Sequence, residues 1–121
     1  MDETIALMHA NLHDVFGERD DDRRAAAARA TYAEDVSFTD EDGTVVGRDA
    51  VEARARALLE RVPADFVFTV DGPLYAGAGR AALAWRFGPP TGEPVARGLD
   101  LATIAGGRIV ALETLLGPRV S

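Results

Sequence analysis

The stretch "ARGLDLATIAGGRIVALETLLG", residues 96–117, has the pattern of two β-strands joined by a turn. Apolar side chains recur along both halves, and Gly106-Gly107 is a signal for a tight turn between antiparallel strands. Asp100 interrupts this pattern, because it stands between two leucines in the first strand. A buried carboxylate costs several kcal/mol unless it is paired, hydrogen-bonded or protonated, so Asp100 is the first candidate functional residue.

Side chains alternate between the two faces of a strand, which places Gly98, Asp100 and Ala102 on one face. Small neighbours leave room beside the carboxylate, as a ligand pocket requires. The alternative is a structural role, in which Asp100 accepts a backbone hydrogen bond or pairs with an arginine. In the first interpretation the expected pocket residues are Leu12, Phe16, Trp85, Phe87, Gly98, Leu112, Thr114 and Leu116.

The rest of the chain predicts helices first and strands last. Ile5, Met8, Leu12, Val15 and Phe16 recur at helical spacing, and Gly17 ends that helix. Further helices are predicted over 23–33 and from 49 to Pro63, a hairpin over 34–47, and strands over 65–70, 80–87, 94–105 and 108–116. We therefore predict a single α+β domain over residues 1–121. Its curved, mostly antiparallel sheet would wrap against three N-terminal helices as a cone with a cavity inside, a cystatin-like α+β barrel.

Composition narrows the classes of partner. The chain has 13 basic and 20 acidic residues and a formal charge of −7, so neither nucleic acid nor an anionic membrane surface is an expected partner. There are no cysteines, and the acidic start "MDETIALMHA" lacks the basic region of a signal peptide. We expect a cytoplasmic protein without a metal or a cofactor, whose partner is a small hydrophobic molecule.

Three segments together carry a family resemblance. "YAEDVSFTDEDGTVVGRDAV" at 32–51, "WRFGPP" at 85–90 and "GLD" at 98–100 with "GGRIVALETLLG" at 106–117 resemble the nuclear transport factor 2-like superfamily. The SnoaL-like branch, which includes polyketide cyclases, is the most similar one, and ketosteroid isomerase shares the same cone fold. The resemblance extends from about Thr4 to Gly117 and says more about fold than about substrate.

The resemblance implies roles for two acids. Asp40 matches the general-base aspartate of ketosteroid isomerase, and Asp100 matches its protonated aspartic acid, which donates a hydrogen bond to the forming enolate. Taken from the residues alone, Asp40 is instead a turn residue at the start of "DEDG". The isomerase's helix-one tyrosine falls on Leu12, which cannot donate a hydrogen bond. His9 and His13 lie nearby and are possible substitutes, although either could simply be a solvated or helix-packing histidine.

The functions that follow are an acid–base enzyme of isomerase, cyclase or lyase type, a non-catalytic ligand-binding protein, or a structural protein whose side chains fill the pocket. The enzyme would act on a hydrophobic carbonyl compound. The outer face of the sheet is expected to form a homodimer, as in the family. The apolar part of that dimer surface would be Leu99, Leu101, Ile109, Ala111 and Leu115.

Overall fold

The computed structural model describes residues 2–117, so the predicted domain ends at 1 and 121 lie outside the described residues. The helices are α1 (Glu3–His9), which continues into the π-helix η1 (Ala10–Phe16), α2 (Asp21–Thr31) and α3 (Arg48–Glu60). The strands are β1 (Tyr32–Asp40), β2 (Gly43–Val46), β3 (Val67–Val70), β4 (Tyr75–Gly77), β5 (Arg80–Gly88), β6 (Ala96–Ala105) and β7 (Arg108–Leu116).

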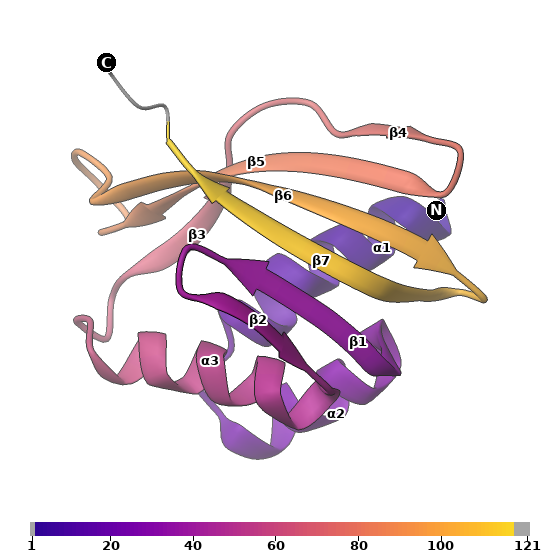
Figure 1. Ribbon diagram of the computed structural model, residues 1–121. Coiled ribbons are helices and arrows are strands. Elements are labelled where there is room, and N and C mark those ends of the chain that lie inside the picture. The colour runs from indigo at the N-terminus through magenta and orange to yellow at the C-terminus, as the bar shows by residue number, and fades with distance from the viewer. Residues whose placement is uncertain (1, 118–121) are drawn as a thin grey trace.

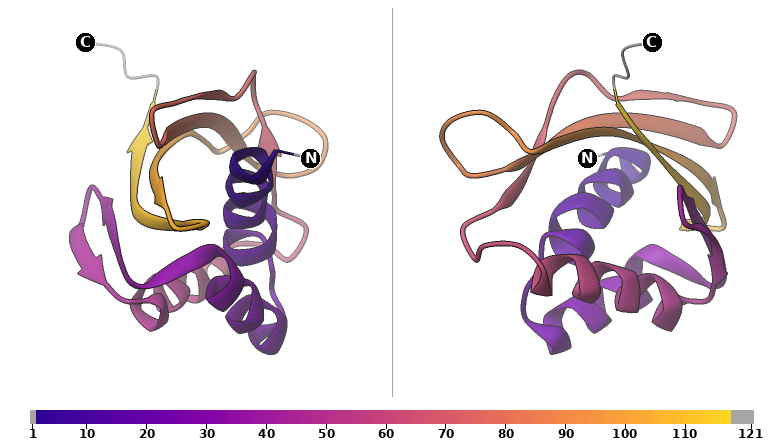
Figure 2. Two further views of the ribbon diagram at one scale, coloured as in Figure 1. Left: turned by 90° about the vertical axis from the view of Figure 1, so that its right-hand side faces the viewer. Right: turned by 60° about the vertical axis from the view of Figure 1, so that its left-hand side comes forward.

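The strands form one curved, open sheet in the order β2-β1-β7-β6-β5-β3, with β4 beside β5. All pairs are antiparallel except β1 and β7, which run parallel. The long strands curve over α1 and η1, and α2 and α3 lie below them (Figure 1; Figure 2). The predicted α+β cone, a mostly antiparallel sheet wrapped against helices, is confirmed.

The core lies between the concave face of the sheet and the helices. Leu83, Trp85 and Phe87 point inward from β5, as their alternation predicts, and each is buried. The helices contribute Met8, Leu12, Val15 and Val51 among other residues. Ile5, predicted on the buried stripe of the first helix, is instead exposed, because the buried face of that helix runs through Leu7 and Met8.

Two of the differences from the sequence prediction change which side chains are buried. β1 begins at Tyr32, where the second helix was expected to continue, because Tyr32 pairs with Ile109 across the parallel contact and is fully buried. In β7 the register shifts between Ile109 and Ala111, which leaves Val110 as the extra residue of a bulge. This bulge turns Ile109 into the core, so Ile109 is not part of the outer face as predicted.

Within residues 2–117, no helix has the length and apolar character needed to cross a membrane. The location in the cell and the homodimer remain predictions.

Candidate active site

Asp100 lies in the middle of β6 on the concave face, with only 5% of its surface exposed. Three uncharged side chains donate hydrogen bonds to its carboxylate. The Trp85 indole Nε1 and the Thr114 hydroxyl donate to Oδ1, at 3.0 and 2.8 Å, and the Asn11 amide Nδ2 donates to Oδ2 at 3.0 Å. Within the described residues no arginine or lysine pairs with Asp100, so neutral donors alone satisfy this buried acid.

Strand register explains how two of these donors reach Asp100. Thr114 of β7 is its direct cross-strand partner. Trp85 of β5 pairs with Gly98, two residues before Asp100 on the same face. An added Cβ on Gly98 would come within 2.3 Å of the Trp85 ring, so the missing side chain lets the indole lie across the strand and reach Asp100.

The third donor comes from the helix. Asn11 is fully buried, and its side-chain Oδ1 accepts a hydrogen bond of 2.5 Å from the Tyr32 hydroxyl. Because that hydroxyl occupies Oδ1, the amide nitrogen is the end that faces Asp100. Asp100, Trp85, Thr114, Asn11 and Tyr32 therefore form one connected polar cluster inside the cone.

Burial raises the pKa of Asp100 from an ordinary 3.8 to about 6. The hydrogen bonds from Trp85, Thr114 and Asn11 oppose this rise, because each stabilises the charged form. Burial and the nearby Asp100 also raise the pKa of Tyr32 well above its usual value, which keeps its hydroxyl proton in place. Asp100 therefore titrates closer to neutral pH than an ordinary aspartate does.

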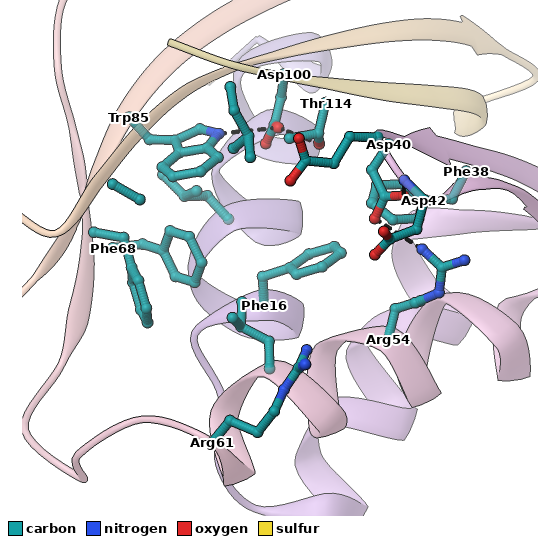
Figure 3. Close-up of a pocket in the computed structure, with 16 residues that line it drawn as sticks. Phe16, Phe38, Asp40, Asp42, Arg54, Arg61, Phe68, Trp85, Asp100 and Thr114 are labelled. Carbon is teal, nitrogen blue, oxygen red and sulfur yellow. Dashed lines mark hydrogen bonds and ion pairs between the residues drawn. The ribbon is translucent and has the colours of Figure 1, made fainter.

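A cavity of about 250 Å³ opens beside Asp100 (Figure 3). Its deep wall is mostly apolar, and Asp100 and Thr114 lie at its sheet side. The predicted pocket residues that line it are Leu12, Phe16, Trp85, Phe87, Thr114 and Leu116. Sequence reasoning missed Phe38, Leu58, Phe68 and Ala96 on the same wall. The presence of this cavity argues against a pocket filled by the protein's own side chains.

Two predicted pocket residues do not line the cavity. Gly98 faces it in register, but the Trp85 indole occupies the space that its small size leaves. Leu112 lies on the predicted concave face opposite Ala102, but it is almost fully buried in the hydrophobic core. The prediction that Gly98 makes room for a ligand is therefore wrong, since the room is made for a hydrogen-bond donor.

The opening of the cavity carries charge. Asp40 lies there at the end of β1 and forms an ion pair of 2.8 Å with Arg54 from α3. Its other oxygen accepts a hydrogen bond from the Asp42 backbone N–H, as its position at the start of a turn suggested. Glu41, Asp42 and Arg61 also line the cavity. Asp40 and Asp100 thus line one cavity, as predicted, but the carboxylate of Asp40 is ion-paired with Arg54.

His9 and His13 do not line the cavity. Their rings pack 5.8 Å apart on the helix, and burial followed by the charge of His9 lowers the pKa of His13, with Asp14 opposing. The donor expected from one of them is instead Asn11, which lies between them in sequence and on the opposite, buried face. The signal for Asn11 was present, because it is the one amide among the apolar residues of that helix face.

Among the described residues no group of three or more histidine, cysteine or acidic side chains is arranged to hold a metal ion. The site consists of the buried Asp100 carboxyl, its three neutral donors and an apolar cavity with charged residues at its opening.

These features define a class: small α+β proteins in which a curved sheet and helices enclose one pocket that carries an acid. The chain belongs to the SnoaL-like family, because the family model of the SnoaL-like domain matches residues 9–112. A search of curated proteins returned no match.

Solved structures support the fold. A candidate isomerase of the SnoaL-like family from Agrobacterium tumefaciens superposes with a TM-score of 0.86 at 23% identity, over 97% of this chain and 99% of that one. A candidate ketosteroid isomerase from Kribbella flavida gives 0.70 at 20% identity, over 98% and 81%. A candidate SnoaL-like polyketide cyclase from Jannaschia gives 0.76 at 15% identity, over 94% and 85%. At these identities the likeness establishes the shared fold.

Proposed function

We propose that the protein is an acid–base enzyme of isomerase or cyclase type that acts on a hydrophobic carbonyl compound, with Asp100 as the general base. The observation that carries this proposal is the position of the Asp100 carboxyl at the cavity with three neutral donors around it. A carboxyl that is ionised at pH 7 yet titrates near 6 can both accept a proton and return it.

The free position on the carboxylate indicates which atom would take the proton. Oδ1 accepts two hydrogen bonds, which fills both of its lone-pair positions, whereas Oδ2 accepts only the one from Asn11. Oδ2 would remove a proton from the carbon next to the substrate carbonyl, and the C–H electron pair would form the enolate. In an isomerisation the same proton returns to another carbon. In a cyclisation the enolate carbon attacks a second carbonyl, and the proton goes to the new alkoxide.

This assignment reverses the roles that the family resemblance implied for the two acids. Asp100 receives hydrogen bonds from all three partners and donates to none of them in its ionised form, so its surroundings suit a base. Asp40 is bound to Arg54 and to the turn backbone, which suits a residue that positions the arginine at the cavity. Tyr32 acts as a positioning residue through Asn11, because its hydroxyl orients the amide toward Asp100.

The donors also limit the substrate. The Trp85 N–H and the Thr114 O–H each spend their only hydrogen on Asp100, so neither is free to stabilise an enolate oxygen. A site of this kind suits a substrate whose C–H is already acidic, such as one next to an aromatic ring or between two carbonyls. Polyketide-like ring compounds have such positions, in keeping with the candidate cyclase among the structural neighbours.

Proton exchange tests the proposal without knowledge of the natural substrate. β-Tetralone is an apolar bicyclic ketone with an acidic C–H, and its exchange with deuterium in D₂O can be followed by proton NMR. We expect the protein to accelerate this exchange, with a rate that rises with pH through about 6 as Asp100 ionises. Asp100→Asn should reduce the protein-catalysed rate by about a hundredfold or more, the usual contribution of a general base.

Asp71→Asn is the matched control, because Asp71 lies on the outer face, where it pairs with Arg86 and Arg97. Its exchange rate should equal that of the unaltered protein. Equal rates for Asp100→Asn and the unaltered protein would refute Asp100 as the base. Saturable binding of β-tetralone with no acceleration would instead support the alternative, a ligand-binding protein of the same fold.

A further inference from the structure

Arg61 lies at the opening of the cavity, directly after α3. Its Nε donates to the Ala57 carbonyl oxygen at 3.1 Å, which holds the base of the guanidinium against the end of the helix. Figure 3 shows the guanidinium turned toward the cavity, on the side opposite Asp40 and Asp42. The two terminal nitrogens are therefore presented to whatever occupies the opening.

The other arginines of this region are already engaged. Arg54, also on the cavity wall, is neutralised by Asp40 at 2.8 Å. Arg19 spends its terminal nitrogens on the carbonyl oxygens of Leu59, Pro63 and Phe66. Among residues 2–117, Arg61 has no acidic side chain within ion-pair distance. It is thus the cavity's available cation, in a protein whose formal charge is −7.

The wall between Arg61 and Asp100 is apolar. Phe16, Leu58 and Phe68 line the cavity, and Figure 3 shows Phe16 between Arg61 and the sheet. A ligand that reaches Asp100 therefore needs an apolar body, and its outer end meets an arginine fork that is suited to two oxygen atoms. The acidic turn at Asp42 lies across the opening, so an anionic group is favoured at the α3 side only.

We propose that Arg61 binds an acidic group of the ligand, so that the substrate class is a hydrophobic carbonyl compound that carries a carboxylate at the end remote from the reacting carbon. This inference rests on the proposed function for the identity of the reacting end. It adds a second contact point, which would orient the ligand lengthwise in the cavity.

Two naphthyl dyes of similar shape distinguish the contribution of an acidic group to binding from the contribution of the apolar rings. Anilinonaphthalene sulfonate carries an acidic group, and N-phenylnaphthylamine is its neutral counterpart. Trp85 is the only tryptophan of the chain and lines this cavity, so energy transfer from Trp85 reports a dye bound in or next to the cavity. The dissociation constant of each dye would be measured for the unaltered protein, for Arg61→Gln and for Arg56→Gln.

Arg56→Gln is the matched control. Arg56 lies on the same helix, is half exposed, sits next to Glu60 at 3.9 Å and does not line the cavity. We expect Arg61→Gln to weaken the sulfonate dye about five- to tenfold, as suits a charge-assisted hydrogen bond that is partly exposed to water, and to leave the neutral dye within about twofold. Arg56→Gln should change neither dye by more than about twofold.

The inference is overturned if Arg61→Gln weakens both dyes equally, if it weakens neither, or if Arg56→Gln has the same effect on the sulfonate dye. In each of these cases, binding of the neutral dye to the unaltered protein shows that the pocket, and with it the proposed function, is intact. If neither dye binds the unaltered protein, the inference falls together with the ligand pocket. Asp100→Asn, which should bind both dyes while losing proton exchange, separates the binding test from the catalytic one.

Discussion

The concave and convex faces of the sheet each hold an acidic residue among several partners, but the partners differ. Asp71 on the convex side is paired with Arg86 at 3.6 Å and Arg97 at 3.1 Å, and its side chain is one-third exposed. Asp100 on the concave side is buried and has only neutral donors. An arginine neutralises the negative charge of a carboxylate, whereas a neutral hydrogen-bond donor stabilises that charge without neutralising it.

The difference in partners explains why the general base that we propose is the buried acid. An exposed ion pair is stabilised mainly by water and by its partners, and it contributes little to stability. A buried carboxyl with neutral donors can exchange between its charged and neutral forms. Burial raises the pKa of this exchange toward neutral pH. Three changes to the protein test this contrast, and their expected effects differ in size.

The largest expected effect is on the pH dependence of stability. Because the pKa of Asp100 is higher in the folded chain, about 6 against 3.8, the folded state binds the proton more tightly. The contribution of Asp100 is therefore fully present below pH 3.8 and is lost as the pH rises through 6. Two pKa units correspond to about 3 kcal/mol of unfolding free energy.

Urea unfolding at several pH values would measure this effect as a difference between two proteins, because other carboxyls titrate in the same range. From pH 7 to pH 4 the unaltered protein should gain about 2 kcal/mol relative to Asp100→Asn, which is most of the full contribution. Curves that run parallel over this range would mean that Asp100 does not titrate near 6. Asp71→Asn, with its exposed partners, should give a nearly parallel curve.

The next effect concerns the close contact between β5 and β6. Gly98→Ala places a Cβ within 2.3 Å of the Trp85 ring, so the indole must move away from Asp100. We expect a loss of about 1–3 kcal/mol in unfolding free energy, as in other overpacked cores. The emission maximum of Trp85 should also shift, because the indole moves away from Asp100. Gly77→Ala is the control, since nothing lies within 4 Å of that position, and an equal loss in both variants would contradict the close contact.

The smallest effect on the folded chain is expected on the convex face. We propose that two copies pair through this face, where Leu115 is 47% exposed beside the half-buried Leu99 and Leu101. Leu115→Glu should change the unfolding free energy of the single chain by less than about 0.5 kcal/mol, since it alters an exposed site. Sedimentation velocity should show a dimer for the unaltered protein and a monomer for the variant. A monomer for both would refute the pairing.

Much of the fold was predictable because it depends on local patterns. Alternation along 80–87 and 94–105 predicted the buried faces of β5 and β6, and the same alternation placed Asp100 inside the cone. The bulge at Val110 was not predictable, because it arises from the pairing of β7 with two neighbours at once. That one extra residue moved Ile109 from the expected outer face into the core.

The site was less predictable than the fold for a related reason. Asp100 was visible as a charge in an apolar strand, but Asn11 and Tyr32 acquire their role only when helix, β1 and β6 meet. Gly98 likewise looked like free space, whereas its space is taken by an indole from the neighbouring strand. The role of a residue such as Gly98 depends on which neighbouring side chain fills the space beside it, and this is decided by tertiary packing.

The polar cluster spans almost the whole chain, from Asn11 to Thr114. Contacts of such large sequence separation form slowly, since the intervening chain must be ordered first. In the folded chain β7 pairs with both β1 and β6, which brings the two ends of this cluster together. The burial and the Thr114 hydrogen bond that act on the pKa of Asp100 both require β7 beside β6, so the raised pKa is a property of the completed sheet and of no single segment.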